Sequence, residues 1–291
     1  MISGFRIALA ASAALMAAAA PVAVSAQTPP AVAASDWRTI APENLLVIDT
    51  SKGRVLVELE PRAAPRHVER IRTLADRGFY DGQKFHRVIA GFMAQTGDPL
   101  GTGEGGSDLP NIPAELTFRR GRDSGFAPVA NAGQGFRGIM GTLPVVTQPD
   151  AQMFVTADFK VDAGGLFCPG VAGMARSSAL DSANSQFFLM MGVNNSLNGA
   201  YTTFGRVVAG LDVVKALKAG PSTTDGAVTD NPDTMSRVRT AAALPEAERP
   251  TVRVMDPRAP AFAQLVVTTR AAKGVGFNIC DIQPPAEVTG G

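Results

Sequence analysis

Residues 85–98 constrain the fold most strongly, because their apolar and polar side chains alternate in the manner of a β-strand. The stretch reads FHRVIAGFMAQTGD and holds one permanent cation, Arg87, among mostly apolar neighbours. Alternate residues of a strand point to opposite faces of a sheet, so this pattern predicts a strand with one face in a core. A cation beside a cluster of apolar side chains is costly unless it serves a site. The stretch therefore predicts a β-rich domain with a functional site at Arg87.

Short runs of strand type and two helical patterns accompany this stretch. One helix is predicted from Pro65, which suits a first helical turn, to about Gly78, and a second from Leu211 to about Gly220. Both carry apolar residues at helical spacing. Further strands are predicted at residues 45–49, 54–60, 171–175, 187–191, 203–208 and 276–282. Many short strands with two helices predict a mainly β fold of the closed-barrel type.

Three shorter motifs follow residues 85–98 along the chain. They are Met174-Ala175-Arg176, Ser185-Gln186-Phe187-Phe188 and Phe204-Gly205-Arg206-Val207-Val208. In these motifs and in their order the chain resembles the cyclophilin family of peptidyl-prolyl cis-trans isomerases. The resemblance covers roughly residues 43–119 and 170–220. The chain between and beyond these blocks is longer than a minimal member of the family needs.

The resemblance implies an eight-stranded antiparallel barrel that is closed and capped by two α-helices. An isomerase domain is then expected at residues 43–282, with two ordered excursions at about 121–168 and 221–275. Residues 27–42 are expected to form a leader, and residues 283–291 a C-terminal tail.

The reaction of this family is rotation about the peptide bond that precedes a proline, and the resemblance implies this activity. Partial double-bond character sets the rotation barrier at about 18–20 kcal/mol. Lowering the barrier needs no cofactor, metal or nucleophile. It needs a pocket for the proline ring and a donor that stabilises the twisted bond. A guanidinium suits that role because it is permanently charged and rigidly forked.

Ten residues are assigned to the site through the resemblance. Arg87 matches the catalytic arginine of the family, and Gln95 is expected to position the substrate backbone. The other eight are expected to bind substrate: Phe92, Met93, Phe188 and Leu197 as an apolar wall, Ala175, Arg176 and Gln186 beside the residue before proline, and Tyr201 where many members carry histidine. Each apolar residue taken alone would be assigned to the core. Ser196 replaces a tryptophan common in the family, so weak inhibition by cyclosporin is expected.

The expected partners are unfolded or folding polypeptides that contain proline. The 27 Lys and Arg residues nearly balance the 26 Asp and Glu residues, so the charge favours neither nucleic acid nor an anionic membrane as a partner. The chain is expected to act as a monomer. An alternative function is that of a peptide-binding chaperone or scaffold module with little turnover, in which the excursions cover the pocket or recruit a partner.

The first 26 residues have the pattern of an export signal. Arg6 precedes an apolar run at about residues 7–20, and Val24-Ser25-Ala26 forms a small-residue cleavage site. Cleavage is expected before Gln27, which predicts a periplasmic or secreted protein that has no membrane segment after processing. The alternative is a membrane anchor, for which the run is short.

Cysteine and histidine usage fits an exported protein without a metal site. Cys168 and Cys280 either form a disulfide or remain two buried thiols. His67 and His86 have no Cys or His neighbours at ligand spacing, so the sequence does not favour metal catalysis, and His86 is expected to be a structural residue beneath the barrel rather than a base. Residues 101–106 fit the pattern G-x-G-x-x-G, but no helix pattern follows. They are expected to form a mobile loop near the site.

Overall fold

The structure is a computed structural model that describes Met1 and residues 32–291. Apart from Met1, the predicted signal peptide and its cleavage site lie outside these residues, as do residues 27–31 of the predicted leader.

An eight-stranded antiparallel sheet forms the centre of residues 32–291. Val55 and Val57 of strand β3 (Gly53–Leu59) enter one hydrophobic core, and Leu56 of the same strand enters another. The sheet is therefore covered on both faces. The predicted strands that begin near residues 45, 54, 171, 187 and 203 are confirmed. In spatial order the strands are β14 (Met235–Thr240), β2 (Leu45–Thr50), β3 (Gly53–Leu59), β13 (Thr203–Ala209), β11 (Val171–Met174), β12 (Phe187–Met190), β5 (Met93–Thr96) and β4 (Arg87–Ile89).

The prediction of a final strand at residues 276–282 is wrong. The chain forms short 3-10 helices at Gly274–Gly276 and Ile279–Asp281 instead. Asn278 and Asp281 make a reciprocal capping box, in which the Asn278 side chain accepts from the backbone N–H of Cys280 and Asp281 accepts from that of Asn278. Such local hydrogen bonds compete with strand pairing and favour a turn.

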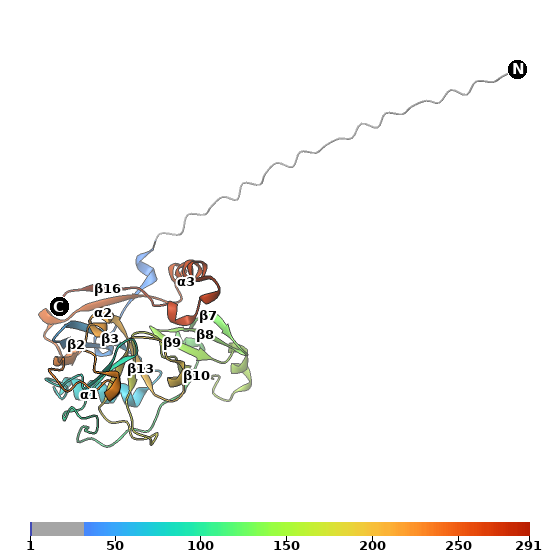
Figure 1. The fold of residues 1–291 in the computed structure, drawn as a ribbon. Helices are drawn as coiled ribbons and strands as arrows, with labels where there is room; N and C mark the ends of the chain where they lie inside the picture. Colours follow the sequence, from blue (N-terminus) through green and yellow to red (C-terminus); the bar gives the residue numbers. More distant parts are fainter. Residues whose placement is uncertain (2–31) are drawn as a thin grey trace. The chain divides into compact units, whose positions relative to one another are not determined.

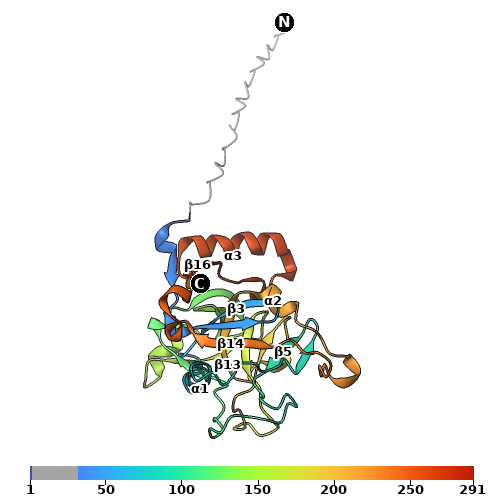
Figure 2. The same cartoon turned by 90° about the vertical axis from the view of Figure 1, so that its left-hand side faces the viewer.

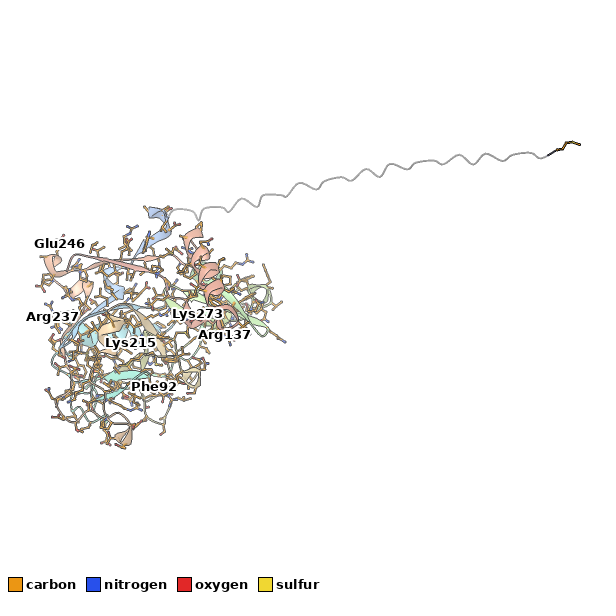
Figure 3. The ribbon with its side chains drawn as sticks, turned by 45° about the horizontal axis from the view of Figure 1, so that its top comes forward. Phe92, Arg137, Lys215, Arg237, Glu246 and Lys273 are labelled. Atoms are coloured by element: carbon orange, nitrogen blue, oxygen red, sulfur yellow. A yellow bond between two sulfur atoms is a disulfide. The ribbon has the colours of Figure 1, made fainter. Side chains whose placement is uncertain are left out.

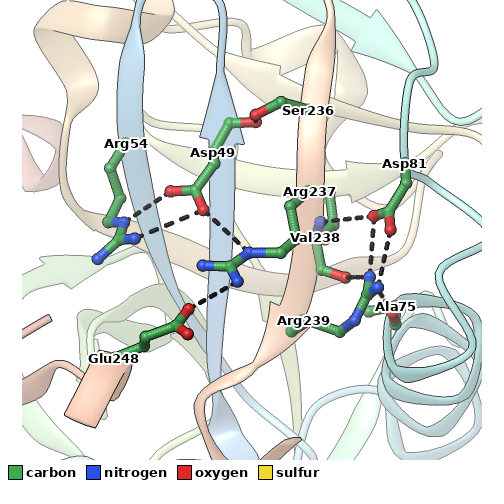
Figure 4. A network of polar contacts seen from close by, with 9 residues as sticks. All are labelled: Asp49, Arg54, Ala75, Asp81, Ser236, Arg237, Val238, Arg239 and Glu248. Carbon is green, nitrogen blue, oxygen red and sulfur yellow. Dashed lines mark hydrogen bonds and ion pairs between the residues drawn. The ribbon is translucent and has the colours of Figure 1, made fainter. Parts of the chain in front are cut away.

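The strand that completes the sheet is β14, which lies inside the predicted excursion 221–275. It pairs with β2, and ion pairs secure it on both sides (Figure 4). Arg237 contacts Asp49 of β2 at 3.4 Å, and Arg239 contacts Asp81 at 2.7 Å. Part of the predicted excursion is therefore an integral strand.

The pairing of strands leaves β14 and β4 as the two edges of the sheet, so the predicted closed barrel is not confirmed. Backbone hydrogen bonds nevertheless join the segments beside these edges. The N–H of Phe85 donates to the carbonyl of Asp233, and the N–H of Met235 donates to the carbonyl of Gln83, both at 2.8 Å. The sheet is thus strongly curled.

Residues 32–291 contain three α-helices rather than the two that were predicted. Helix α1 (Pro65–Asp76) buries Val68, Ile71 and Leu74, as its spacing predicts. Helix α2 (Leu211–Lys215) is shorter than predicted. Helix α3 (Pro260–Lys273) lies in the predicted excursion 221–275 and is the long upper helix in Figure 2.

The predicted excursion 121–168 forms a second antiparallel sheet together with β6, which precedes it. Its strands are β6 (Phe118–Arg120), β10 (Val161–Gly165), β9 (Leu143–Thr147), β8 (Gly135–Met140) and β7 (Ala127–Ala132), in that spatial order. A 3-10 helix at Asp150–Val155 connects β9 with β10. Figure 1 shows β7 to β10 together on one side of the chain, beneath α3. We refer to these five strands as the inserted sheet.

The predicted leader and tail are partly built into the fold. Strands β1 (Trp37–Thr39), β15 (Thr251–Met255) and β16 (Ala286–Thr289) form a three-stranded antiparallel sheet with β15 in the middle. The two ends of the described chain therefore pair with the same strand.

One hydrophobic core connects the inserted sheet, the C-terminal segment and the floor of the predicted site. Ile139 of β8 and Phe262 of α3 belong to the same buried cluster as Met93 and Phe188. Because protein interiors are closely packed, removing one buried side chain disturbs the side chains around it. The inserted sheet and α3 are therefore part of the support for the site.

Two further links fasten the C-terminal segment. Cys168 and Cys280 form a disulfide with their Cα atoms 5.0 Å apart, which confirms the first of the two alternatives. Burial lowers the pKa of Arg206 to about 10, so it stays charged at neutral pH. Its guanidinium donates to the carbonyls of Thr142 and Ile282 at 3.2 and 3.1 Å. Arg206 thereby joins the central sheet, the inserted sheet and the C-terminal segment.

Candidate active site

Arg87 and Gln95 lie side by side because β4 and β5 are antiparallel neighbours with these two residues in register. The Nη1 of Arg87 donates to the Oε1 of Gln95 at 3.2 Å, and the Nε2 of Gln95 donates to the Oε1 of Gln186 at 2.9 Å. The two residues assigned as catalytic from the sequence are therefore in direct contact.

Asp225 holds the other edge of the Arg87 guanidinium. The Nε of Arg87 donates to the Asp225 carbonyl at 3.0 Å, and its Nη2 donates to the carboxylate at 2.9 Å. Asp225 was not among the site residues predicted from the sequence, and it lies in the predicted excursion 221–275. The Asp225-Gly226 pair is a turn signal, and Asp225 has a φ of 51°, but neither feature indicates an arginine partner.

A cavity of about 180 Å³ lies beside the guanidinium. Nine of the ten assigned residues line it, and Gln186 is the exception. The lining consists of Arg87, Phe92, Met93, Gln95, Ala175, Arg176, Phe188, Leu197 and Tyr201. Figure 3 labels Phe92, together with Arg137 on β8 of the inserted sheet. We refer to this cavity as the proline pocket.

Aromatic rings fix two walls of the pocket. Phe188 is 5% exposed, and its ring stacks on that of Phe167 with the centroids 5.7 Å apart. The ring of Tyr201 meets Phe188 edge-on at 5.8 Å, and the Arg176 guanidinium lies 4.7 Å above Tyr201. Aromatic and cation–π contacts of this kind hold side chains in one orientation. The pocket is therefore shaped before any substrate arrives.

Gln186 lies next to the proline pocket, in a second cavity of about 590 Å³. Its Nε2 donates to the carbonyls of Gly103 and Gly105 at 2.9 and 2.7 Å. This cavity shares Gln95, Ala175 and Arg176 with the proline pocket. The two cavities are therefore continuous along the strand that the resemblance assigns to the residue before proline.

The loop at residues 98–106, which borders the second cavity, is anchored rather than free. The Asp98 carboxylate accepts from the backbone N–H groups of Leu100, Thr102 and Gly103 at 2.6–2.8 Å. Burial raises the pKa of Asp98, but these hydrogen bonds outweigh it and lower the pKa below its usual value. The predicted loop does lie near the site, but the Asp98 carboxylate anchors its backbone, which the prediction of a mobile loop did not include.

Among Met1 and residues 32–291, no group of three or more His, Cys, Asp or Glu side chains is placed to hold a metal ion. No helix within those residues has the length and hydropathy that a membrane crossing requires. Ser196 is exposed, and its hydroxyl donates to the Oδ1 of Asn194 at 2.6 Å.

Comparison with known proteins identifies the family. A family model described as cyclophilin type peptidyl-prolyl cis-trans isomerase/CLD matches residues 45–240. A "probable peptidyl-prolyl cis-trans isomerase" of Brucella suis is 36% identical over 229 residues, which covers 75% of this chain and 90% of that protein. The chain belongs to the cyclophilin family. Its activity is therefore that of a peptidyl-prolyl cis-trans isomerase.

Two further relatives agree with this cyclophilin assignment. A "peptidyl-prolyl cis-trans isomerase-like 1" of Rhizopus delemar is 32% identical over 172 residues, covering 59% of this chain and 78% of that protein. The crystal structure of cyclophilin AquaCyp293 from Hirschia baltica matches with a TM-score of 0.78 and 32% identity. It covers 87% of this cyclophilin and 94% of that chain. The family model ends at residue 240, which is also the last residue of β14.

Proposed function

We propose that this cyclophilin isomerises X-Pro bonds in the proline pocket, with Arg87 as the catalytic donor. The observation that carries this proposal is that the Arg87 guanidinium lines the same cavity as Phe92, Met93 and Phe188. A proline ring buried against these side chains gains roughly 25 cal/mol for each Å² of apolar surface removed from water. The pocket therefore holds the ring while the charged edge of the site faces the bond that rotates.

Twisting the peptide bond returns the lone pair to the prolyl nitrogen, which then becomes a hydrogen-bond acceptor. Asp225 and Gln95 accept three hydrogen bonds from Arg87, and a guanidinium has five N–H groups, so two remain for substrate. A donor that is already in place stabilises the twisted state without reorganisation. Arg87 therefore lowers the barrier by binding the twisted bond more tightly than the planar one.

Asp225 and Gln95 act as positioning residues for Arg87. Each contacts a different part of the guanidinium, which leaves the cation little freedom to turn away from the pocket. Gln186 extends this support, since it contacts both Gln95 and the carbonyls of the loop at residues 98–106. The residues before proline then lie along Ala175 and Arg176.

The proposed substrates are proline-containing polypeptides that fold after export, in the periplasm or outside the cell. A disulfide is stable in such oxidising compartments, which agrees with the Cys168–Cys280 bond. The predicted signal sequence agrees with the same location. Mass measurement of the protein recovered from the cell envelope tests this part, because a processed chain begins at Gln27.

We also propose that the curled sheet behaves as a closed barrel and that the enzyme acts as a monomer. The hydrogen bonds that link Phe85 with Asp233 and Met235 with Gln83 support closure, since they span the two edges. Hydrogen exchange tests it, because a closed barrel protects the amides of β4 and β14 as strongly as those of central strands.

A rate assay separates the isomerase from a peptide-binding module with little turnover. The chain from residue 27 onward is added to an Ala-Pro-Phe peptide in a protease-coupled assay. We expect cis-to-trans exchange, which takes tens to hundreds of seconds unaided, to become much faster. Exchange at the uncatalysed rate together with peptide binding would establish the binding module instead.

A further inference from the structure

The inserted sheet has a large hollow that the proposed isomerase site does not use. A cavity of about 540 Å³ lies over β8, β9 and β10. Gly135, Val146 and Gly164 line it from these strands, with Leu116 before β6 and Gln152 from the 3-10 helix. Cavities of roughly 300–1,000 Å³ are typical of sites for small ligands. This cavity therefore has room for a short peptide segment.

A single loop separates this cavity from the proline pocket. Leu197 and Tyr201 line the proline pocket, whereas Asn198 and Gly199 between them line the cavity. Asn198 is fixed in this position because its Oδ1 accepts from the backbone N–H of Phe167 at 2.8 Å. A polypeptide that leaves the proline pocket past Leu197 therefore reaches the cavity next.

The other side of the proline pocket is already assigned. Gln95, Ala175 and Arg176 connect it with the cavity that contains Gln186, where the residues before proline lie under the proposed function. The chain that follows the proline must leave elsewhere. The loop at residues 197–201 borders both the proline pocket and the cavity of the inserted sheet, so it marks the other way out of the pocket.

The lining suits a peptide segment without charged side chains. Asp162 is the one ionisable residue in the lining, and its carboxylate is paired with Arg119 at 2.6 Å. Gln134 and Gln152 contribute side-chain amides to the lining. Amides can both donate to and accept from peptide groups. An uncharged backbone segment therefore finds hydrogen-bond partners in this cavity.

We infer that this cavity binds the uncharged residues that follow proline in the same substrate polypeptide. The inference rests on the proposed function of the proline pocket and assigns the inserted sheet a role in choosing substrates. Substrates with a neutral segment after proline bind both in the proline pocket and in this cavity. Substrates with a charged segment after proline bind in the proline pocket alone.

Gly164 is the position at which the cavity can be filled with the least disturbance. A Cβ atom there meets the carbonyl of Leu116 at 3.6 Å, an ordinary contact, and its backbone is outside the left-handed region. Gly164→Trp therefore places an indole in the cavity. Gly276→Trp is the matched control, because Gly276 has open space around it and is not part of the lining.

The test compares fluorescein-labelled Ala-Pro peptides extended by one, three or five uncharged residues after proline. Affinity is measured by fluorescence anisotropy, and exchange by NMR. We expect five residues to tighten binding about 5- to 30-fold over one residue. Gly164→Trp should abolish this gain, and Gly276→Trp should keep it. Gln152→Ala, which adds no bulk, should reduce the gain at least twofold.

Extension before proline serves as the internal control, since Gly164→Trp should not change its effect. Equal affinity for short and long peptides would overturn the inference, as would equal gains in Gly164→Trp and Gly276→Trp. Failure to accelerate exchange of the shortest peptide contradicts the proposed function instead. The anisotropy series still decides the inference in that case, because it does not need turnover.

Discussion

At the scale of single residues, the proposed catalysis depends on how the Arg87 guanidinium is held. Its Nε and Nη2 face the backbone and the carboxylate of Asp225, and its Nη1 faces Gln95. The Asp225 side chain is 78% exposed, so solvent screens its attraction for the cation. The carboxylate therefore contributes orientation more than charge neutralisation, and the guanidinium remains an effective donor.

Asp225→Asn tests this positioning role. The variant keeps the backbone carbonyl and loses the ion pair, which is worth about 0.2–1 kcal/mol for exposed groups. We expect kcat to fall about 2- to 5-fold while KM for a short peptide stays nearly constant. The loss should shrink at 1 M salt, because salt screens exposed ion pairs.

Asp230→Asn is the matched control, since Asp230 belongs to the same loop but pairs with Lys218 at 3.3 Å, outside the proline pocket. A value of kcat for Asp225→Asn that equals or exceeds that of the wild type would show that Asp225 does not orient Arg87.

At the scale of elements, the loop at residues 98–106 carries one side of the substrate cleft. Asp98 anchors it through three backbone N–H groups, and Gln186 meets its carbonyls. His86 is 6% exposed beside Gly103, and its ring nitrogens have no hydrogen-bond partner among residues 32–291. A buried neutral imidazole under an anchored loop makes this region sensitive to acid.

The pH dependence follows from the pKa of His86, which burial lowers below 6.5 although the charge of Asp98 opposes this. As the pH falls, His86 therefore takes up its proton near pH 6.5 in the unfolded chain and only at a lower pH in the folded chain. We expect the free energy of unfolding to fall as pH drops below about 6.5 and to stop falling below the folded pKa. Thermal unfolding of the wild type and His86→Leu between pH 8 and 5 measures this. Parallel curves would exclude His86 as the cause.

How much the sequence predicts also differs between elements. The stretch 85–98 was predicted as a strand, but it forms two, β4 and β5, joined by a turn at residues 90–92, which is why Arg87 and Gln95 face each other. Helix α1 was predicted correctly, because its apolar residues have a clear helical spacing. β14 was missed because a register shift between Met235 and Arg237 breaks its period of two. Asp225 was missed because a turn residue shows its partner only after the chain has folded.

At the scale of the whole molecule, the inserted sheet and the C-terminal segment support the proline pocket through a shared hydrophobic core. Ile139 of the inserted sheet, Phe262 of α3 and Phe188 of the proline pocket share one core. Arg206 and the Cys168–Cys280 disulfide fasten the C-terminal segment to that core. The stability of the pocket should therefore depend on segments far from it in sequence.

Replacing both Cys168 and Cys280 by serine tests this dependence. The disulfide closes a loop with a sequence separation of 112 residues, and its loss should lower the free energy of unfolding by about 2–5 kcal/mol. Denaturant unfolding measures the change. Reducing the wild type with dithiothreitol should lower its free energy of unfolding to that of the variant. Equal free energies of unfolding for all three forms would show that the disulfide does not stabilise the folded protein.

The most direct test of the account is the turnover of Arg87 variants on an Ala-Pro-Phe peptide. We expect Arg87→Ala to lower kcat/KM by about 10²–10³, the effect of removing a preorganised donor, with an unchanged circular dichroism spectrum. Arg87→Lys should lose nearly as much, because an ammonium lacks the fork that Asp225 and Gln95 hold. Folded variants that retain close to full turnover would contradict the assignment of Arg87 as the catalytic donor.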